Sequence, residues 1–337
     1  AGQDLASTGT PVAWVTRECV RAGTGRHIGI LLPRTGKYAG LSDTQFAAAI
    51  AAVRVLEATA ESGLSVIWAD SGSTPQQAQK AAEELLKNGA KVLVGPVGSK
   101  NVRAVATEVK GQAQVVIPGE GAGTAVGVAP SLEARGRALV TYANDRKYTE
   151  VVVLGPPSGY TRRVVSGLQA RAAKLGMTVT TIDYEPNQTS FRAVLAPVIG
   201  RIRKRAAVVV VDRIRRAELV FRQLVRDGVK PSSGALVLTT GEGVGGEVLA
   251  QTNGVFEGVV MAPAAWPDPE GGAFADYYRE QEGTEPDDQA WLVWSALTRA
   301  WRGNAGDAPP VARLVRVEGG RLVLEPSQEQ LTVRPPG

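Results

Sequence analysis

Short apolar runs alternate with helix-length amphipathic stretches over most of the chain, from His27 to Met261. A polar or Gly-rich turn follows most of these runs. Uninterrupted apolar strands separated by helices are typical of a parallel sheet that helices cover on both faces. We expect the strands at residues 28–33, 64–70, 91–96, 114–119, 150–156, 206–212, 235–241 and 258–263. In such sheets ligands bind beyond the carboxyl ends of the strands, so the pattern also indicates where a binding site lies.

Helix-start signals follow several of the expected strands. Ser42, with Gln45 three residues later, forms a capping pattern ahead of an Ala-rich stretch. Thr74-Pro75 places a proline at the first position of the next helix, where its missing N–H is tolerated. Ser99 directly follows a strand and begins another helix. The helices are therefore expected over residues 42–60, 75–86, from 99, and over 132–145.

Two stretches of small residues without periodicity, Gly119–Ser131 and Ala262–Gly272, interrupt this order. Such loosely patterned connections are natural places for a chain to cross between domains, and 337 residues suit two domains. We predict one lobe from residues 20–130 plus 264–310, a second from 131–263 plus 311–337, and an N-terminal arm over 1–19. In the tail, the alternating segment Val311–Pro326 with Glu-Gly-Gly-Arg at its centre predicts a β-hairpin.

The composition excludes most catalytic chemistry. With 44% hydrophobic and 21% charged residues the chain is globular, but it holds a single histidine, His27, and a single cysteine, Cys19. The nucleophile pattern G-x-S-x-G does not occur, and His and Cys are too few for a triad or for a metal site of the usual ligand spacing. We therefore expect a protein that is not an enzyme, with no metal and no cofactor.

Net charge and hydropathy limit the kinds of partner that the chain is expected to bind. The net charge of +5 is modest, and the densest basic cluster, Arg201–Arg205, has no aromatic residues among it, so we expect no nucleic-acid binding. No apolar run reaches the roughly 18 residues of a transmembrane helix. The small, polar start of the chain, AGQDLASTGT, reads as a mature or trimmed N-terminus, which is compatible with an export signal or lipid anchor ahead of it.

Gly241–Gly246, GEGVGG, matches the dinucleotide-binding pattern G-x-G-x-x-G. That pattern also requires an acidic residue about 20 positions later, where this chain has Val259-Val260-Met261. The motif stands late in the chain instead of after the first strand. We therefore reject a nicotinamide-dinucleotide site.

An ordered set of four segments resembles the type I periplasmic binding proteins, the group that contains the Leu/Ile/Val-binding proteins of ABC transporters. The segments are ILLPRTGKYAG (Ile30–Gly40), DSGSTPQQAQKAAEEL (Asp70–Leu85), VLVGPVGS (Val92–Ser99) and GEGVGGEVLAQTNGVFEGVVMAP (Gly241–Pro263). The resemblance covers about residues 26–302 and implies an α/β fold of two Rossmann-like lobes, joined by three crossovers, that close on a ligand. It implies an exported periplasmic or cell-envelope protein that binds an amino acid or related small polar ligand for ABC-type uptake or sensing, with an ABC permease as a possible partner.

The resemblance also assigns site residues. Ser99, after Gly-Pro-x-x, matches the serine that holds the ligand carboxylate, which suits the N–H groups of a helix N-terminus. Glu242 matches the carboxylate for the ligand ammonium, Tyr160 an aromatic residue that packs on the ligand, and Tyr38 a residue at the mouth of the cleft. The same residues also fit plainer roles: Ser99 as a helix cap, Glu242 as a solvated turn acid, and Tyr160 as a cover for a strand end.

Two segments depart from the pattern of that family. Where the family has two small residues and a threonine after a proline, this chain has Gly119, Glu120 and Gly121, and a loop that often offers a tyrosine reads Asp212-Arg213. These residues favour a more polar ligand than a branched-chain amino acid. LLPRTGKYAG and VVDRIRRAEL (Val210–Leu219) equally resemble a branch of the fold that activates penicillin-binding proteins. An envelope lipoprotein that binds a cell-wall synthase is therefore the alternative function.

Overall fold

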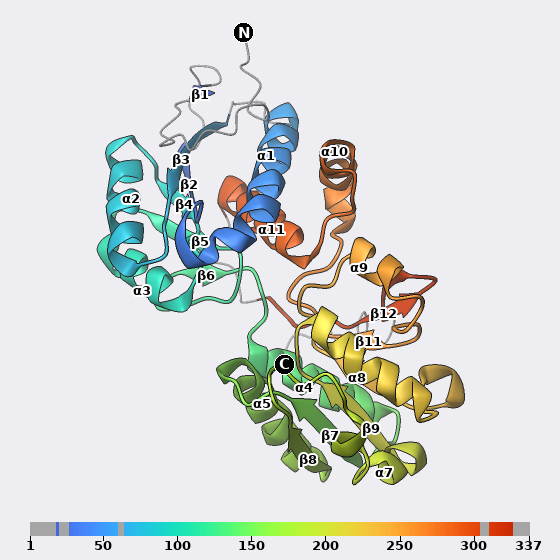
Figure 1. Cartoon of the computed structure of the whole chain (residues 1–337). Coiled ribbons are helices and arrows are strands. Elements are labelled where there is room, and N and C mark those ends of the chain that lie inside the picture. The colour runs from blue at the N-terminus through green and yellow to red at the C-terminus, as the bar shows by residue number, and fades with distance from the viewer. Residues whose placement is uncertain (1–17, 20–26, 60–63, 304–309, 326–337) are drawn as a thin grey trace, which may run out of the picture.

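A computed structural model describes residues 18–19, 27–59, 64–303 and 310–325, and within them the strands form two sheets (Figure 1). One sheet has six strands in the order β1-β3-β2-β4-β5-β6, and the other has seven in the order β13-β12-β11-β10-β9-β7-β8. The strands are β1 Glu18–Cys19, β2 His27–Leu32, β3 Ser65–Asp70, β4 Val92–Val94, β5 Gln114–Ile117, β6 Val126–Gly127, β7 Glu150–Gly155, β8 Thr178–Asp183, β9 Ala206–Val210, β10 Val237–Thr239, β11 Val260–Met261, β12 Val315–Glu318 and β13 Arg321–Leu324.

Helices lie between most of these strands. The α-helices are α1 Ser42–Thr59, α2 Pro75–Lys87, α3 Ser99–Glu108, α4 Leu132–Asp145, α5 Gly159–Leu175, α6 Arg192–Leu195, α7 Ile199–Lys204, α8 Ile214–Arg226, α9 Gly246–Gln251, α10 Gly272–Glu282 and α11 Asp288–Arg302. Three short 3-10 helices are η1 Gly36–Leu41, η2 Pro231–Ser233 and η3 Pro269–Gly271. The helix starts predicted at Ser42, after Thr74 and at Ser99 are confirmed, and Thr74 forms the capping box with Gln77.

The interior strand pairs are parallel, as the apolar runs predicted. β2 pairs in parallel with β3 and β4, and β7 with β8 and β9. Antiparallel pairing is confined to strands near the edges, where β1 meets β3 and the hairpin β12–β13 meets β11. The hairpin predicted in the tail is thereby confirmed. Successive side chains on a strand point to opposite faces, so a strand covered on both faces must be apolar throughout.

Helices cover both faces of each sheet. Val152 and Leu154 of β7 pack with α8 residues such as Phe221, whereas their neighbours Val151 and Val153 pack with α4 and α5. In the first sheet, one face packs against α1, α10 and α11, and the other against α2 and α3. The aromatic side chains of α11 are part of this core, because Trp291 and Trp294 are both buried.

Within the described residues the chain crosses between the two sheets three times: after β6, after β11 and after α11. The second crossing returns α10 and α11 to the first sheet, and the third adds β12 and β13 to the second sheet. Two α/β lobes joined by three crossovers are the predicted fold class. The residue boundaries of the lobes stay a prediction, and the predicted N-terminal arm lies outside the described residues except for Glu18 and Cys19.

The sequence analysis missed β6, β8, α6 and α7. Strand β8, TVTTID, lies at the edge of its sheet and is partly exposed along its length. It therefore lacks the continuous apolar run of a strand that is covered on both faces. α6 and α7 have four and six residues, which is too short for a helical pattern to be visible in the sequence.

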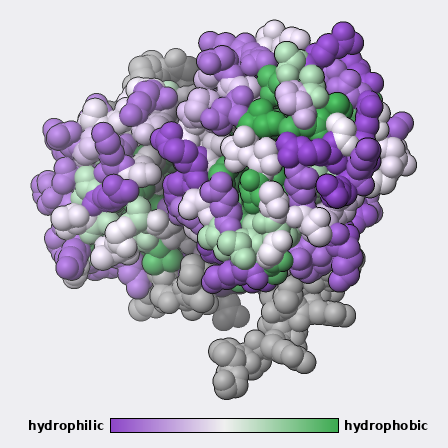
Figure 2. Space-filling view, turned by 90° about the horizontal axis from the view of Figure 1, so that it is seen from below, coloured by the Kyte–Doolittle hydropathy of each residue, from purple (hydrophilic) through white to green (hydrophobic). Residues whose placement is uncertain are grey.

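The face in Figure 2 is mainly hydrophilic, with hydrophobic residues between the hydrophilic ones and the largest group of them toward the upper right. Among the described residues, no helix combines the length and the apolar character needed to cross a membrane.

Two helical glycines bring α4 and α5 into backbone contact. A Cβ on Gly136 of α4 would lie 2.2 Å from the carbonyl oxygen of Val164, and a Cβ on Gly167 of α5 would lie 2.1 Å from that of Glu133. Any larger residue must push the helices apart. This close contact matters for the site because α4 and α5 carry several of its residues.

We expect Gly167→Ala to lower the free energy of unfolding by about 1–3 kcal/mol, because the added methyl group overpacks the contact with α4. Gly200→Ala on α7 is the matched control, since a Cβ there meets nothing within 4 Å. The control should be neutral or stabilising by up to about 1 kcal/mol. Urea unfolding followed by circular dichroism measures both, and equal effects of the two substitutions would contradict the contact.

Candidate functional site

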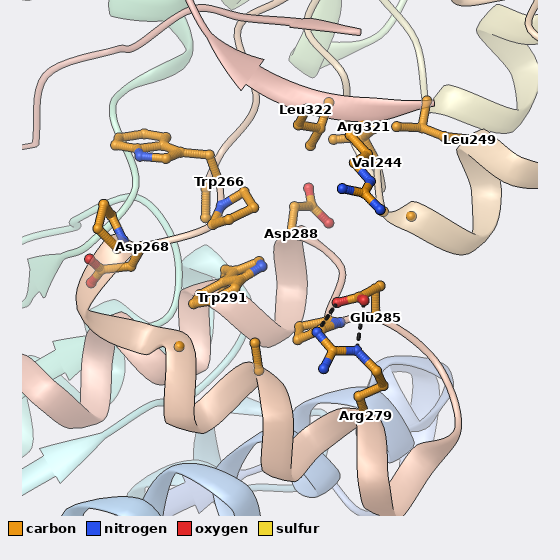
Figure 3. A pocket seen from close by; sticks show the side chains of 18 of the residues that line it. Val244, Leu249, Trp266, Asp268, Arg279, Glu285, Asp288, Trp291, Arg321 and Leu322 are labelled. Carbon is orange, nitrogen blue, oxygen red and sulfur yellow. Dashed lines mark hydrogen bonds and ion pairs between the residues drawn. The ribbon is translucent and has the colours of Figure 1, made fainter. Parts of the chain in front are cut away.

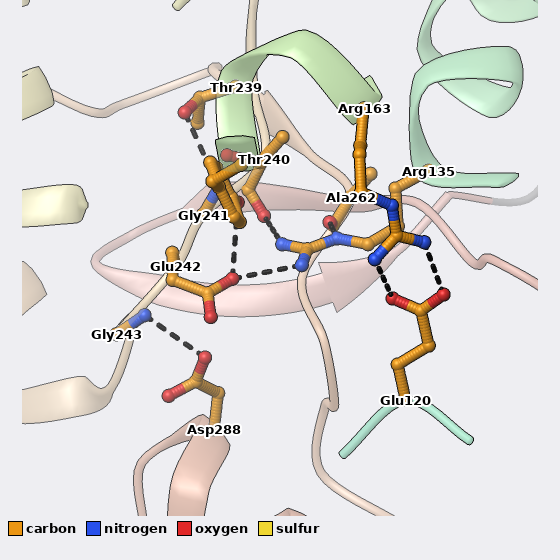
Figure 4. Close-up of polar contacts among 11 residues, drawn as sticks. Glu120, Arg135, Arg163, Thr239, Thr240, Gly241, Glu242, Gly243, Ala262 and Asp288 are labelled. Atoms are coloured by element: carbon orange, nitrogen blue, oxygen red, sulfur yellow. Dashed lines mark hydrogen bonds and ion pairs between the residues drawn. The ribbon is translucent and has the colours of Figure 1, made fainter. Parts of the chain in front are cut away.

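Loops at the carboxyl ends of parallel strands from both sheets meet at the boundary between the sheets (Figure 4). Glu120, in the loop after β5, pairs with Arg163 of α5, which follows β7. In the loop after β10, the N–H of Gly243 donates to Oδ2 of Asp288 on α11 over 3.0 Å. The predicted site residues lie in these loops or in others at the same strand ends, which is where an α/β sheet binds ligands.

Tyr38 and Ser99 lie together on the first sheet. The loop that holds Tyr38 is fixed at its start by Asp70, whose carboxylate accepts the N–H of Arg34 at 2.8 Å and the hydroxyl of Thr35 at 2.7 Å. The phenol of Tyr38 lies against Gly98, because a Cβ there would approach its hydroxyl to 2.5 Å.

Gly98, with φ of +92°, is the N-cap of α3, and no side chain caps this helix. Ser99 is the first helical residue and is exposed, so it is not the capping residue that its type suggested. The first N–H groups of α3 therefore have no side-chain acceptor. Helix N-termini of this kind attract anions.

Gly119, Glu120 and Gly121 form a tight loop after β5, at the same carboxyl ends of the strands. A Cβ on the facing Gly127 would lie 2.1 Å from the Gly121 nitrogen, so the loop and β6 touch through backbone atoms. Glu120 points outward to Arg163, whose guanidinium also binds Glu133 (Nε to Oε1, 2.6 Å). The side chain of Arg163 is half-exposed, so each of these pairs contributes at most about 1 kcal/mol.

The second sheet forms one wall of the site, and the buried guanidinium of Arg135 on α4 lies at the centre of that wall. Only 2% of this residue is exposed. Nε donates to the carbonyl oxygen of Ala262 over 2.6 Å, Nη2 to that of Thr240 over 2.6 Å, and Nη1 to Oε2 of Glu242 over 2.9 Å (Figure 4). A buried cation needs both a counter-ion and hydrogen bonds, and Arg135 has both.

Glu242 binds the guanidinium of Arg135 and also accepts a hydrogen bond from Tyr160. The phenol of Tyr160 donates to Oε2 of Glu242 over 3.2 Å, and burial raises the pKa of Tyr160, so it is a neutral donor at physiological pH. Oε1 of Glu242 makes no hydrogen bond within the described part of the chain, and the side chain is 29% exposed. The carboxylate thus has one oxygen bound in the protein and one available.

Asp212 and Arg213 complete the wall. The backbone of Arg213 pairs with that of Glu242, and the next residue, Ile214, donates its N–H to the carbonyl oxygen of Glu242 over 2.7 Å. Asp212 accepts the phenol of Tyr184 over 2.7 Å and the N–H of Arg213 over 2.7 Å. Asp212 therefore orients its loop, whereas the Arg213 side chain is exposed.

Asp288, at the start of α11, faces this wall from the first sheet. Its N–H donates to Val244 and its carboxyl group accepts from Gly243, so it fastens α11 to the loop that carries Glu242. Burial and the nearby charge of Glu242 raise the pKa of Asp288 to about 8. The carboxyl group is therefore largely protonated at neutral pH.

The structure thus places the nine predicted residues in two groups, one on each side of the site, and in a loop that connects the two sides. Tyr38 and Ser99 lie on one side, Tyr160, Asp212, Arg213 and Glu242 on the other, and the Gly119–Gly121 loop joins both through Arg163. Within the described residues, no hydrogen bond or ion pair connects the Ser99 side directly to Glu242. No cluster of three or more His, Cys, Asp or Glu residues in the described part could hold a metal ion.

The sequence analysis missed Arg135, Arg163 and Asp288. Arg135 follows a crossover at the first turn of a helix, but charged residues at such positions are usually exposed, so its burial has no sequence signal. Asp288 likewise follows Asp287, which caps α11 by accepting the N–H of Ala290. Acidic residues at a helix start are common caps, and only the packed structure shows which one is buried.

Comparison with known proteins identifies the family. The family model described as "Periplasmic binding protein" matches residues 26–305. No curated protein sequence matched the chain. A putative branched-chain amino acid ABC transporter protein from Rhodospirillum rubrum has a TM-score of 0.73 at 15% identity, covering 89% of this chain and 100% of that one.

Two further solved structures were determined with ligands. The substrate-binding protein LivJ from Streptococcus pneumoniae, in complex with isoleucine, has a TM-score of 0.64 at 16% identity and covers 89% of this chain and 99% of that one. A solute-binding protein from R. palustris in complex with benzoate has a TM-score of 0.61 at 18% identity, with 89% and 95% covered. At these identities the likeness establishes the type I periplasmic binding protein fold.

Arg135→Met should lower the free energy of unfolding by about 3–5 kcal/mol, because Glu242 and two carbonyl oxygens lose their buried partner. The matched control is Arg137→Met on the exposed side of the same helix, for which we expect a change within about 0.5 kcal/mol. Urea unfolding at neutral pH gives both values. A small effect at Arg135 would contradict its central role.

Asp288→Asn should raise the free energy of unfolding at about pH 8 by on the order of 1–3 kcal/mol. The folded protein keeps a proton on Asp288 that the unfolded chain releases near its ordinary pKa of about 4, so wild-type stability falls as pH rises from about 4 to 8. The gain should vanish near pH 4. Asp276→Asn, at an exposed acid of α10, is the control. A gain that does not grow with pH would refute the raised pKa.

Proposed function

We propose, because the chain belongs to the periplasmic binding protein family, that it is an exported solute-binding protein of an ABC-type uptake or sensing system. It closes on a small polar ligand with a carboxylate group, an amino acid or a related acid. It performs no catalysis and needs no cofactor. An ABC permease is the partner to which the loaded protein would deliver its ligand.

The arrangement of Ser99 and Glu242 carries this proposal. Ser99 stands at an uncapped helix N-terminus on one sheet, beside Tyr38, and supplies a hydroxyl group and backbone N–H groups for an anion. Glu242 stands on the other sheet with one carboxylate oxygen available for a donor. A ligand with an anionic end and a hydrogen-bond donor fits between such groups.

Arg135 affects which kind of hydrogen-bond donor the ligand must carry to bind Glu242. Because its guanidinium already balances the charge of Glu242, the site does not require a full positive charge on the ligand. An ammonium or a hydroxyl group can donate to Oε1. The ligands in the relatives' structures, isoleucine and benzoate, share a carboxylate group, which supports an acid as the ligand here.

We expect the two lobes to close on the ligand because the site is divided between them. Contacts with both sheets are complete only when the two lobes approach, so the ligand stabilises the closed state by its higher affinity for that state. Glu120 and Arg163 already join the two sides by an ion pair. Because the pair is partly exposed and weak, it does not oppose a change of the angle between the lobes.

The alternative, an envelope lipoprotein that activates a cell-wall synthase, is not favoured by the contacts of the described residues. The two functions differ in what they expect of the site. A solute carrier saturates with a small ligand, whereas a synthase activator binds its partner enzyme whether or not the site can hold a solute.

Calorimetric titration with amino acids, hydroxy acids and aromatic acids should reveal one class that saturates at one molecule per chain. Ser99→Ala should weaken that ligand by about tenfold, the effect of one hydrogen bond in a protected site, and Tyr160→Phe by a similar factor, because Glu242 loses the phenol that orients it. Tyr148→Phe is the matched control, since its phenol donates to Gly234 away from the site. No saturable binding by the wild-type protein, or unchanged affinity in both variants, would overturn the proposal.

A further inference from the structure

A cavity of about 540 Å³ lies at the crossovers, apart from the site described above. Its walls come from α9, the crossover after β11, α10, the start of α11 and the β12–β13 turn. In Figure 1, α9 and α10 lie to the right, whereas α3 and α5, which carry Ser99 and Tyr160, lie to the left. None of the nine predicted site residues lines it.

Five large apolar side chains line the cavity, together with small residues, prolines and five charged residues, Asp268, Arg279, Glu285, Asp288 and Arg321. Val244 and Leu249 come from the second sheet's side, Leu322 from the hairpin, and Trp266 and Trp291 from the crossover and α11 (Figure 3). Trp291 is almost fully buried by its neighbours, and Trp266 is partly buried. Two indole rings at one cavity suit a flat apolar ligand, and their faces also attract cations.

Among the charged residues that line the cavity, Asp288 is the one whose side chain is buried. Asp288 is 1% exposed, and in Figure 3 its carboxyl group points into the space bordered by Trp291, Val244 and Arg321. Oδ2 accepts the N–H of Gly243. Oδ1 is buried and has no hydrogen-bond partner in the part of the chain that the structure describes. A buried acceptor without a donor is costly, so a ligand that supplies a donor gains this free energy.

The charges around Asp288 favour a positive donor. Glu242 and Asp287 add negative charge and Arg135 adds positive charge, so carboxylates outnumber cations at this position, and the resulting field raises the pKa of Asp288. Arg279 is occupied by Glu285 (Nε to Oε1, 2.7 Å) at the edge of the cavity, and the exposed Arg321 stands at its mouth.

We propose that this cavity is a second binding site, for a small organic ammonium ion with an apolar ring. The ammonium group stabilises the ionised form of Asp288, so this carboxyl group releases its proton to solvent on binding and accepts the ammonium at Oδ1, and the ring lies against Trp266 and Trp291. The proposal is independent of the proposed function, because the two sites share no side chain that contacts a ligand.

Tryptamine tests the site by calorimetric titration, with indole-3-acetate as the anion on the same ring. Tryptamine should bind at one molecule per chain, and indole-3-acetate at least about tenfold more weakly, because its carboxylate has no donor for Oδ1 and lies close to the negative charge of Glu242. Asp288→Asn should weaken tryptamine by about tenfold or more while keeping an acceptor for Gly243. Ala275→Tyr on α10, which fills the cavity from a partly exposed position, should abolish binding.

Two control variants locate the ligand. Asp287→Asn changes a carboxyl group one residue away, outside the cavity lining, and should lower the affinity less than Asp288→Asn. Ser99→Ala, in the other site, should leave tryptamine binding unchanged. Circular dichroism confirms that each variant is folded. The proposal fails if about 1 mM tryptamine gives no saturable heat or if indole-3-acetate binds equally well. It also fails if Asp288→Asn leaves the affinity for tryptamine unchanged or if Ser99→Ala abolishes tryptamine binding.

Discussion

The buried guanidinium of Arg135 is the constraint on which the site depends. It ties the first turn of α4 to the loop after β10 and to the crossover after β11, through the carbonyl oxygens of Thr240 and Ala262. The same cation holds Glu242, and Glu242 holds Tyr160. Because an unpaired buried charge is so costly, this set of contacts forms as a unit, and the geometry of one wall of the site is set by that unit.

The two walls are built in different ways. On the first sheet, backbone geometry dominates: Gly98 adopts a positive φ, α3 begins without a side-chain cap, and Tyr38 packs against the glycine. On the second sheet, side-chain charges dominate. A ligand between the walls meets N–H groups at one end and a charge-balanced carboxylate at the other. This asymmetry is the physical basis for proposing an acid with a neutral or cationic donor.

Asp288 links the two proposed sites. It fastens α11 to the loop that carries Glu242, and its free oxygen faces the cavity at the crossovers. A change in the charge of this carboxyl group therefore acts on both a contact between the sheets and a cavity between them. If a ligand at one site moves this loop and so changes the affinity of the other site, linkage requires that the effect be reciprocal, by the same factor.

The sequence by itself determined the fold class, because a strand buried on both faces must be apolar throughout, as in Ala206–Val210, and that pattern is visible in one dimension. It also located the site loops, since parallel strands fix which loops share an edge, and Glu242 and Tyr160 do meet there. Only the tertiary structure decided the charge balance. Whether Arg135 or Arg137 is buried, and whether Asp288 or Asp287 is the buried acid, depends on contacts between residues more than 40 positions apart. Such contacts cannot be predicted from local sequence patterns, because whether a charged side chain is buried depends on the distant residues that pack against it.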